Sequence, residues 1–142
     1  MSIRRGAGLT AVAFTALLLS LTIAPVALAG FKSGAYEGTT SQETEIRFTA
    51  TQLAVKKFSF NVTIDCEDGT MLQFEGDGAR APIGEKGGFK AEFVGDGITS
   101  VVSGKLKHRR ASGAIDTAGT LPGGGECSSS VDWSARRQKP VG

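Results

Sequence analysis

The feature that most constrains this chain is a regular alternation of apolar and polar side chains after residue 30. In residues 58–66, two phenylalanines, a valine, an isoleucine and Cys66 alternate with Ser, Asn, Thr and Asp. Successive side chains of a β-strand point to opposite faces, so this run predicts a strand whose buried face includes Cys66. Weaker runs of the same period lie at residues 46–50, 89–93, 102–106, 111–117 and 131–135. No window after residue 30 has the period of an amphipathic helix, and the pattern therefore predicts an all-β domain.

Glycine-rich turn sequences separate these runs. Asp68-Gly69 and residues 76–78 and 95–97 place glycine beside aspartate, and glycine supplies the positive φ that tight hairpins need. The links are too short for helical crossovers, so we expect an antiparallel up-and-down meander of about eight strands. Such a meander either closes into a small barrel or folds as a two-sheet β-sandwich. We favour a closed or nearly closed barrel, because closure removes exposed strand edges.

Two segments, residues 74–78 and 93–97, both have the sequence Phe-x-Gly-Asp-Gly. A calcium loop requires several converging oxygen ligands, whereas each segment offers one aspartate, with Glu75 as an addition in the first. We therefore interpret them as two equivalent hairpin turns. The sequence predicts no metal site and no cofactor.

The first 29 residues have the three parts of a secretory signal peptide. Arg4 and Arg5 form a positive start, residues 9–23 are almost continuously apolar, and residues 27–29 provide an Ala-x-Ala cleavage sequence. A membrane anchor needs about 20 apolar residues and no such exit, so we expect a signal-peptide helix cleaved near Ala29. The predicted organisation is a signal peptide at 1–29, a single β domain at 30–137 and a flexible tail at 138–142. A secreted or cell-envelope protein, exported by a Sec-type signal and without a transmembrane segment in its mature part, follows from this organisation.

The cysteine count fits this compartment. Cys66 and Cys127 are the only cysteines, and an even number in an exported chain predicts a disulfide. Neither cysteine belongs to a CxxC pair or has a histidine nearby in sequence, which disfavours a redox-active or zinc-binding pair.

Net charge is balanced in the expected mature chain. Arg4 and Arg5 are two of the 16 basic residues, so their removal leaves as many basic residues as the 14 acidic ones. A chain with almost no net charge lacks the general attraction for nucleic acid that basic proteins have. We therefore expect no nucleic-acid partner.

Two short basic clusters are nevertheless the best local candidates for a binding surface. They contain Lys105, Lys107, Arg109 and Arg110 in the first cluster, and Arg136, Arg137 and Lys139 in the second. If folding brings the clusters together, they form a surface for a polyanion such as a cell-wall polymer, an acidic glycan or an anionic lipid headgroup. The alternative interpretation is ordinary surface charge that keeps a strand edge soluble.

Several aromatic side chains stand at positions expected to point inward, and they are candidates for a core or a pocket. They are Tyr36, Phe48, Phe58, Phe60, Phe89, Phe93 and Trp133. Such rings either fill the interior of a small barrel or line a cavity for a small apolar ligand. Tyr36 belongs to the first expected strand and Trp133 to the last, and these strands are neighbours in a closed meander. We therefore expect the two rings to lie close together.

No catalytic constellation is apparent in the sequence. His108 is the only histidine, and no nucleophile motif such as G-x-S-x-G accompanies it. A carboxylate-dependent hydrolase needs two acids facing one another, but Asp65, Glu92 and Asp132 fall on the outward phase of their expected strands. We therefore predict a non-catalytic binding or structural module, with no catalytic residues. The alternatives are a barrel that binds a small apolar ligand and, second, a small carboxylate-dependent hydrolase.

An ordered series of short motifs supports a family resemblance. The series consists of Gly34-x-Tyr36-x-Gly38, Ile46-x-Phe48, the run at 58–66, Gly104-x-Leu106, Gly113-x-Ile115, Cys127 and the segment 131–136. It resembles the small exported all-β domain proteins of actinobacteria, a group described as uncharacterised or hypothetical, over nearly the whole mature chain. There is a looser similarity to avidin-like and lipocalin-like barrels, but the lipocalin opening G-x-W is missing because Tyr36 stands where the Trp is expected. The resemblance implies a β fold and no particular enzyme activity, cofactor or site residue.

Overall fold

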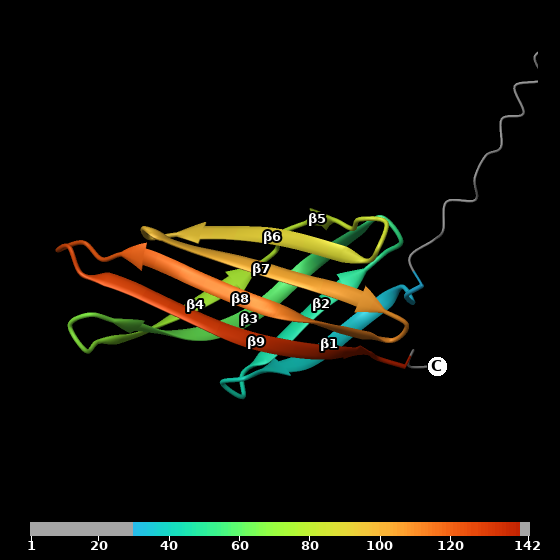
Figure 1. Cartoon of the computed structure of the whole chain (residues 1–142), viewed down its shortest axis with the longest axis horizontal. Helices are drawn as coiled ribbons and strands as arrows, with labels where there is room; N and C mark the ends of the chain where they lie inside the picture. Colours follow the sequence, from blue (N-terminus) through green and yellow to red (C-terminus); the bar gives the residue numbers. More distant parts are fainter. Residues whose placement is uncertain (1–29, 140–142) are drawn as a thin grey trace, which may run out of the picture.

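The described part of the chain is built from β-strands joined by turns and bends. The computed structural model describes residues 30–139; the predicted signal peptide, with its expected helix, lies outside them, as do residues 140–142. The strands are β1 (Gly34–Thr40), β2 (Glu45–Ala50), β3 (Ala54–Cys66), β4 (Met71–Asp77), β5 (Ala81–Pro82), β6 (Gly88–Gly95), β7 (Ile98–Lys107), β8 (Arg110–Thr120) and β9 (Glu126–Arg137) (Figure 1). The all-β prediction is confirmed.

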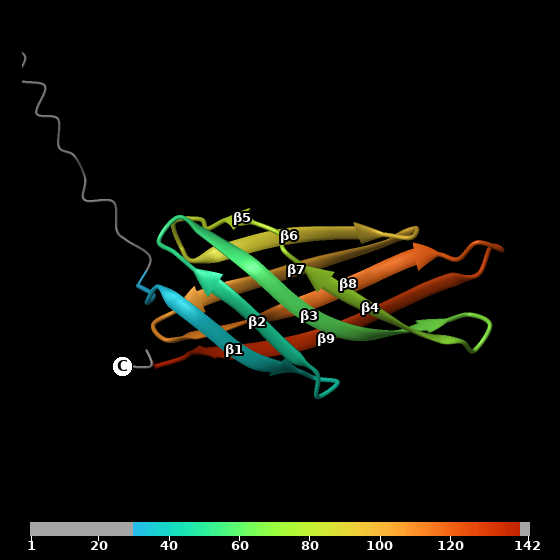
Figure 2. The ribbon, with the colours of Figure 1, turned by 180° about the vertical axis from the view of Figure 1, so that it is seen from behind.

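The strands pair antiparallel in the order β4-β3-β2-β1-β9-β8-β7-β6, and the short β5 pairs with β3. Strands that follow one another in sequence are thus mostly neighbours, as the meander requires, and the pairing of β1 with β9 joins the two halves. Figures 1 and 2 show these halves as two crossing layers, with β6–β9 on one side and β1–β4 on the other. Each layer presents its apolar face to the other.

A second pairing of β9 closes the barrel. At 13 residues β3 is much longer than the six-residue β2, so its far end extends beyond β2. There Asp65 pairs with Ser128 and Cys66 with Cys127. Strands β1, β2, β3 and β9 therefore form a closed ring, from which β4 extends on one side and β8, β7 and β6 on the other. The prediction of a small closed or nearly closed barrel is confirmed.

The predicted disulfide lies at this closure. Cys66 and Cys127 are directly opposite one another on β3 and β9, and their sulfurs are bonded over a separation of 61 residues. The bond fixes the one contact that joins the far end of β3 to the other layer. It is thus placed where the ring depends on few backbone pairs.

Glycine makes room for the largest rings in the core. Gly104, Gly113 and Trp133 form one row across β7, β8 and β9, and the indole of Trp133 donates a hydrogen bond to the carbonyl of Ser103, 3.1 Å away. A Cβ atom at Gly104 would lie 2.4 Å from the Trp133 ring. Gly104 therefore makes room for the indole, whereas a Cβ atom at Gly113 would collide with the backbone of Ser103 on β7.

One of the two Phe-x-Gly-Asp-Gly segments is not a turn, and the prediction of two equivalent hairpins is wrong. Residues 95–97 do form the β6–β7 hairpin, but Gly76 and Asp77 continue β4 opposite Phe60 and Ser59. A Cβ atom at Gly76 would lie 2.1 Å from the Phe60 ring. The glycine therefore accommodates an aromatic ring in mid-strand, a role that its sequence neighbours do not distinguish from a turn.

The phase of β3 changes at a bulge that the alternation did not predict. Thr49 pairs with Lys56 and Arg47 with Ser59, so one residue of β2 is opposed by two of β3. Lys57 takes a left-handed φ of 56° at this point, as the extra residue of such a bulge often does. The shift allows both Val55 and Phe58 to be buried.

Candidate basic binding surface

The barrel brings the two predicted basic clusters together on the outer face of β7, β8, β9 and β1. Arg110 lies directly opposite Lys107 on β7 and directly opposite Arg136 on β9. Arg136 in turn faces Glu37 on β1. Residues as far apart in sequence as Glu37 and Arg136 thus stand in one row across four strands, because β9 pairs with both β1 and β8.

These cations surround a hollow of about 530 Å³, which we call the strand hollow. Its charged lining residues are Lys105, Lys107, Arg110, Arg136 and Glu37. Its floor consists of small side chains on adjacent strands, among them Ser112, Ser134 and Thr39, which form the neighbouring row. A flat floor with long cationic side chains along one border suits an extended ligand that carries negative charge.

The arrangement of the cations is unfavourable for the folded protein by itself. Like charges directly opposite one another on paired strands destabilise a sheet, and Lys107, Arg110 and Arg136 make two such pairs in a row. Among residues 30–139, the single ion pair within 4 Å joins Arg47 to Glu45, at 2.8 Å. Glu37 borders the row without forming such a pair. The row therefore has more positive charge than its surroundings neutralise.

The turn between β7 and β8 projects further charge beyond the strand ends. His108 and Arg109 form a two-residue hairpin loop, and His108 has a left-handed φ of 58°. The loop is anchored by residues 30–32, because the N–H of His108 donates to the carbonyl of Gly30 at 2.6 Å and the N–H of Lys32 donates to the carbonyl of His108 at 2.8 Å. Both His108 and Arg109 have exposed side chains.

A second hollow, which we call the hairpin hollow, lies at this loop. Its volume is about 880 Å³, and it is lined by Gly30, Phe31, Lys32, Gln52, Lys107, His108, Arg109 and Arg110. Lys107 and Arg110 line both hollows. Lys32, Gln52 and Glu37 were not predicted to join the basic clusters, because the alternation of side chains does not reveal the strand register that brings them there.

Arg137 differs from the other members of the clusters. It lies on the inward phase of β9, is half-buried, and its Nε donates to the carbonyl of Ser33 at 2.6 Å. Its side chain also packs against Gly34. Arg137 therefore ties the start of β1 to β9, and it does not line the strand hollow. Lys139 is exposed beyond the strand end and lines neither hollow.

Charges of opposite sign separate along the strands of the layer β6–β9. Its outward cations lie toward the β7–β8 turn, and the farthest of them, Lys90, stands in the same row as Asp132. Beyond that row the outward charged side chains of the layer are acidic, namely Glu92, Asp116 and Glu126. Within this layer, the positive surface is therefore confined to the end that carries the two hollows.

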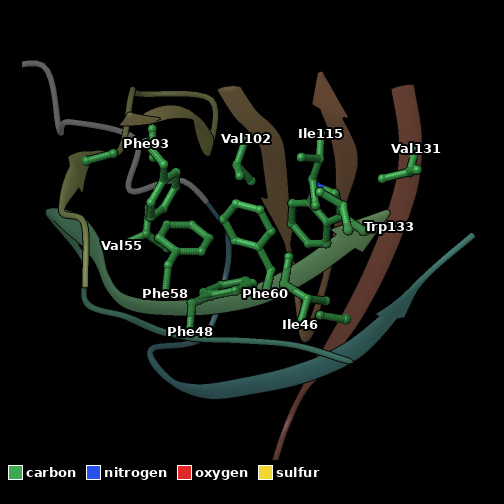
Figure 3. Packing of buried hydrophobic residues seen from close by; sticks show 14 of the residues in the cluster. Ile46, Phe48, Val55, Phe58, Phe60, Phe93, Val102, Ile115, Val131 and Trp133 are labelled. Atoms are coloured by element: carbon green, nitrogen blue, oxygen red, sulfur yellow. The ribbon is translucent and has the colours of Figure 1, made fainter. Parts of the chain in front are cut away.

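The candidate pocket residues fill the interior. Phe48 is the hub, with ring centroids 5.1 Å from Tyr36, 5.2 Å from Phe58, 5.9 Å from Phe89 and 5.7 Å from Trp133. Figure 3 shows Phe48, Phe58 and Phe60 turned toward Val102 and Ile115 of the opposite layer. Tyr36 and Trp133 do not pair with each other: β9 places Trp133 opposite Thr40, four residues along β1 from Tyr36, and Phe48 stacks on Tyr36 and meets Trp133 edge-on. These rings contact one another where a ligand would have to lie.

Tyr36 also has a polar role at the edge of this core. Its hydroxyl donates to the carbonyl of Lys32 at 2.6 Å. Burial raises the pKa of Tyr36 above its usual value, while the nearby positive charge of Arg137 and the hydrogen bond to Lys32 act in the opposite direction. The tyrosine thus connects the aromatic core to the segment that anchors the β7–β8 turn.

The carboxylates of the described residues are all exposed, including Asp65, Glu92 and Asp132. The buried polar side chains are hydroxyls, and Ser100 and Thr117 bond to each other at 2.8 Å. No group of three or more His, Cys, Asp or Glu residues within 30–139 is arranged to hold a metal ion. In the same range, no helix has the length and apolar character needed to cross a membrane.

Comparison with known proteins identifies no relative of this chain. No protein-family model, curated protein or solved structure matches the chain. The resemblance to small exported actinobacterial domains, and the looser one to avidin-like and lipocalin-like barrels, therefore stay predictions.

Proposed function

We propose that this protein is an exported, non-catalytic β-barrel that binds a linear anionic polymer on the outer face of β1, β9, β8 and β7. The observation that carries the proposal is the row Lys107, Arg110 and Arg136, in which like charges are directly opposed across three strands. Such a row costs folding stability. A multivalent anion that lies across it removes the repulsion and gains several charge-assisted contacts at once.

The shape of the surface favours a chain over a single small anion. Neighbouring strands are about 4.8 Å apart, so Lys107 and Arg136, two strands apart, are separated by about 10 Å across the sheet. One phosphate or carboxylate group meets all three cations only if their long side chains converge on it. A polymer with a negative charge on every unit reaches all three cations, as a wall polymer or an acidic glycan does.

Export agrees with this role. A disulfide between Cys66 and Cys127 is compatible with an extracellular protein. We propose that cleavage after Ala29 releases the barrel into the cell envelope or the medium, where anionic polymers are accessible to it.

Calorimetric titration of residues 30–142 with long-chain inorganic polyphosphate tests the proposal. We expect binding at low salt that weakens steeply as salt rises, since each neutralised anionic group releases a counterion. The double variant Lys105→Gln/Arg136→Gln should lose about tenfold in affinity, which corresponds to about 1.4 kcal/mol for the two lost contacts together. The matched control Lys86→Gln/Lys90→Gln removes two exposed cations that line neither hollow.

Three results would overturn the proposal. One is the absence of polyphosphate binding at low salt, and another is an equal loss of affinity in both double variants, which indicates attraction without a site. The third is binding to vesicles of anionic phospholipid without binding to any soluble anionic polymer. Neutral dextran serves as the uncharged polymer control.

A further inference from the structure

The strand hollow and the hairpin hollow are separate depressions that share two of their cations. Lys107 and Arg110, the residues that flank the two-residue turn, line both. A path from one hollow to the other therefore crosses the base of the β7–β8 turn without leaving positively charged surface. Each hollow also has cations of its own: Lys105 and Arg136 in the first, Lys32 and Arg109 in the second.

We infer that the two hollows are consecutive subsites for one anionic chain, which passes over the base of the β7–β8 turn. The inference rests on the proposed function and adds a second site and a minimum ligand length to it. A short anion binds in the strand hollow alone, where the hydroxyls of Thr39, Ser112 and Ser134 can donate hydrogen bonds to it. A long chain continues past Lys107 and Arg110 into the hairpin hollow and there meets Lys32 and Arg109.

The hairpin hollow is built as a fixed site. Residues 30–32 bond to both the N–H and the carbonyl of His108, and the side chain of Gln52 donates to Ser33 Oγ at 2.8 Å and to the carbonyl of Phe31 at 3.4 Å. Phe31 is buried, with 6% of its surface exposed. The segment that carries Lys32 is therefore held against the turn that carries Arg109, and the backbone accounts for the geometry without help from either cationic side chain.

The two ends of the path differ in chemistry. The strand hollow has a floor of hydroxyl and other small side chains and ends at Glu37, which stands between Arg136 and Arg47. The hairpin hollow contains Phe31 among its lining residues and has no acidic one. The chain is therefore expected to continue at the hairpin side, because Glu37 repels it at the other.

The test compares a short and a long ligand of the same chemistry, inorganic triphosphate and long-chain polyphosphate, on residues 30–142. In the variant Lys32→Gln/Arg109→Gln we expect affinity for long polyphosphate to fall about tenfold, with affinity for triphosphate unchanged within about twofold. The salt dependence of long-chain binding should also become shallower, since two fewer charges are neutralised. Both substituted side chains are exposed, so folding is expected to be unaffected, which a thermal melt verifies.

The outcomes separate this inference from the proposed function. If Lys105→Gln/Arg136→Gln weakens both ligands while Lys32→Gln/Arg109→Gln weakens neither beyond the Lys86→Gln/Lys90→Gln control, the strand hollow binds anions and the second subsite does not exist. Equal loss for triphosphate and polyphosphate in Lys32→Gln/Arg109→Gln also contradicts consecutive subsites. If no variant differs from the control, the proposed function fails as well.

Discussion

The two ends of the barrel differ in how the strands are joined and in the sign of their surface charge. At the disulfide end, β3 and β9 are covalently joined, and the hollow beside the joint is lined by Asp65, Glu67 and Glu126 with no cation. At the hairpin end, the strands carry Lys107, Arg110 and Arg136 opposite one another. This end is held by backbone hydrogen bonds between residues 30–32 and His108 and between Gln138 and Ala35. The disulfide end holds the ring closed, whereas the hairpin end carries opposed positive charges that do not stabilise the fold.

Stability and ligand binding therefore depend on different ends of the barrel. The apolar faces of both layers lie beneath the charged row, so the hairpin end tolerates repulsion on its surface because its core is filled. Substitutions at the disulfide end and in the core should therefore lower stability, whereas removing a cation at the hairpin end should weaken ligand binding without lowering stability.

The disulfide should make the largest contribution to stability. The bond closes a separation of 61 residues, for which loop-closure entropy predicts a loss of about 4 kcal/mol on removal. We expect Cys66→Ala/Cys127→Ala to lower the free energy of unfolding by that order in urea titrations. A loss below about 1 kcal/mol would contradict the claim that this end holds the barrel closed. If the variant stays folded, its affinity for polyphosphate should be unchanged.

Gly104→Ala tests whether tight packing against Trp133 contributes to stability in the core beneath the hairpin end. The new methyl group would lie 2.4 Å from the ring of Trp133, and overpacking of this kind costs about 1–3 kcal/mol. The matched control is Gly84→Ala, whose Cβ would be 3.5 Å from its nearest neighbour and which should be close to neutral. Thermal melts of both variants measure the difference, and equal melting temperatures would show that the indole moves aside freely.

Arg110→Thr should raise stability and lower affinity for polyphosphate. Removing the central cation abolishes both opposed pairs, and threonine suits a strand, so we expect a gain of about 0.5 kcal/mol at low salt. The gain should vanish at high salt, where the repulsion in the original row is screened. Affinity for polyphosphate should fall in the same variant. A loss of stability at low salt would mean that the row contributes to folding.

Glu37→Gln is the reciprocal test at the border of the row. Glu37 faces Arg136 on β9 and Arg47 on β2, so removing its charge should slightly lower stability, by a few tenths of a kcal/mol. Affinity for polyphosphate should rise, because the residue that repels the ligand is gone. Titration at two salt concentrations measures the change, and a weaker affinity would place Glu37 among the binding residues instead.

The smallest effect concerns the acid dependence of the disulfide end. Hydrogen bonds from the side chain and the N–H of Thr70 lower the pKa of Asp68 below its usual value. A lowered pKa contributes stability that is complete above the pKa of the unfolded chain, about 3.9, and is lost as pH falls through the lower folded value. Asp68→Asn should therefore flatten the fall in stability below about pH 4. An identical slope in both proteins would contradict this assignment.

Period-two alternation was sufficient to predict the class and the inward faces, because both depend on side-chain phase within one strand. The disulfide was predicted from the even number of cysteines in a chain with a signal sequence. The role of Gly76 was not predictable, since only the position of the Phe60 ring distinguishes it from a turn glycine. The bulge at Lys57 was hidden for a related reason: it depends on the register between β2 and β3. The sequence predicted a binding surface only if Arg110 and Arg136 met in the fold, and strand pairing decides that. Arg137 has the same phase as the inward residues Trp133 and Ala135, so its inward position could have been predicted from the alternation.

The most direct test of the central claim is a pair of melting curves, with and without polyphosphate, for residues 30–142 and for Lys107→Gln/Arg110→Gln/Arg136→Gln. If the row serves binding at the expense of folding, the triple variant melts at the higher temperature without ligand, and only the original protein is stabilised by polyphosphate at low salt. If the triple variant melts at the lower temperature without ligand, or polyphosphate stabilises both proteins equally, the claim is contradicted.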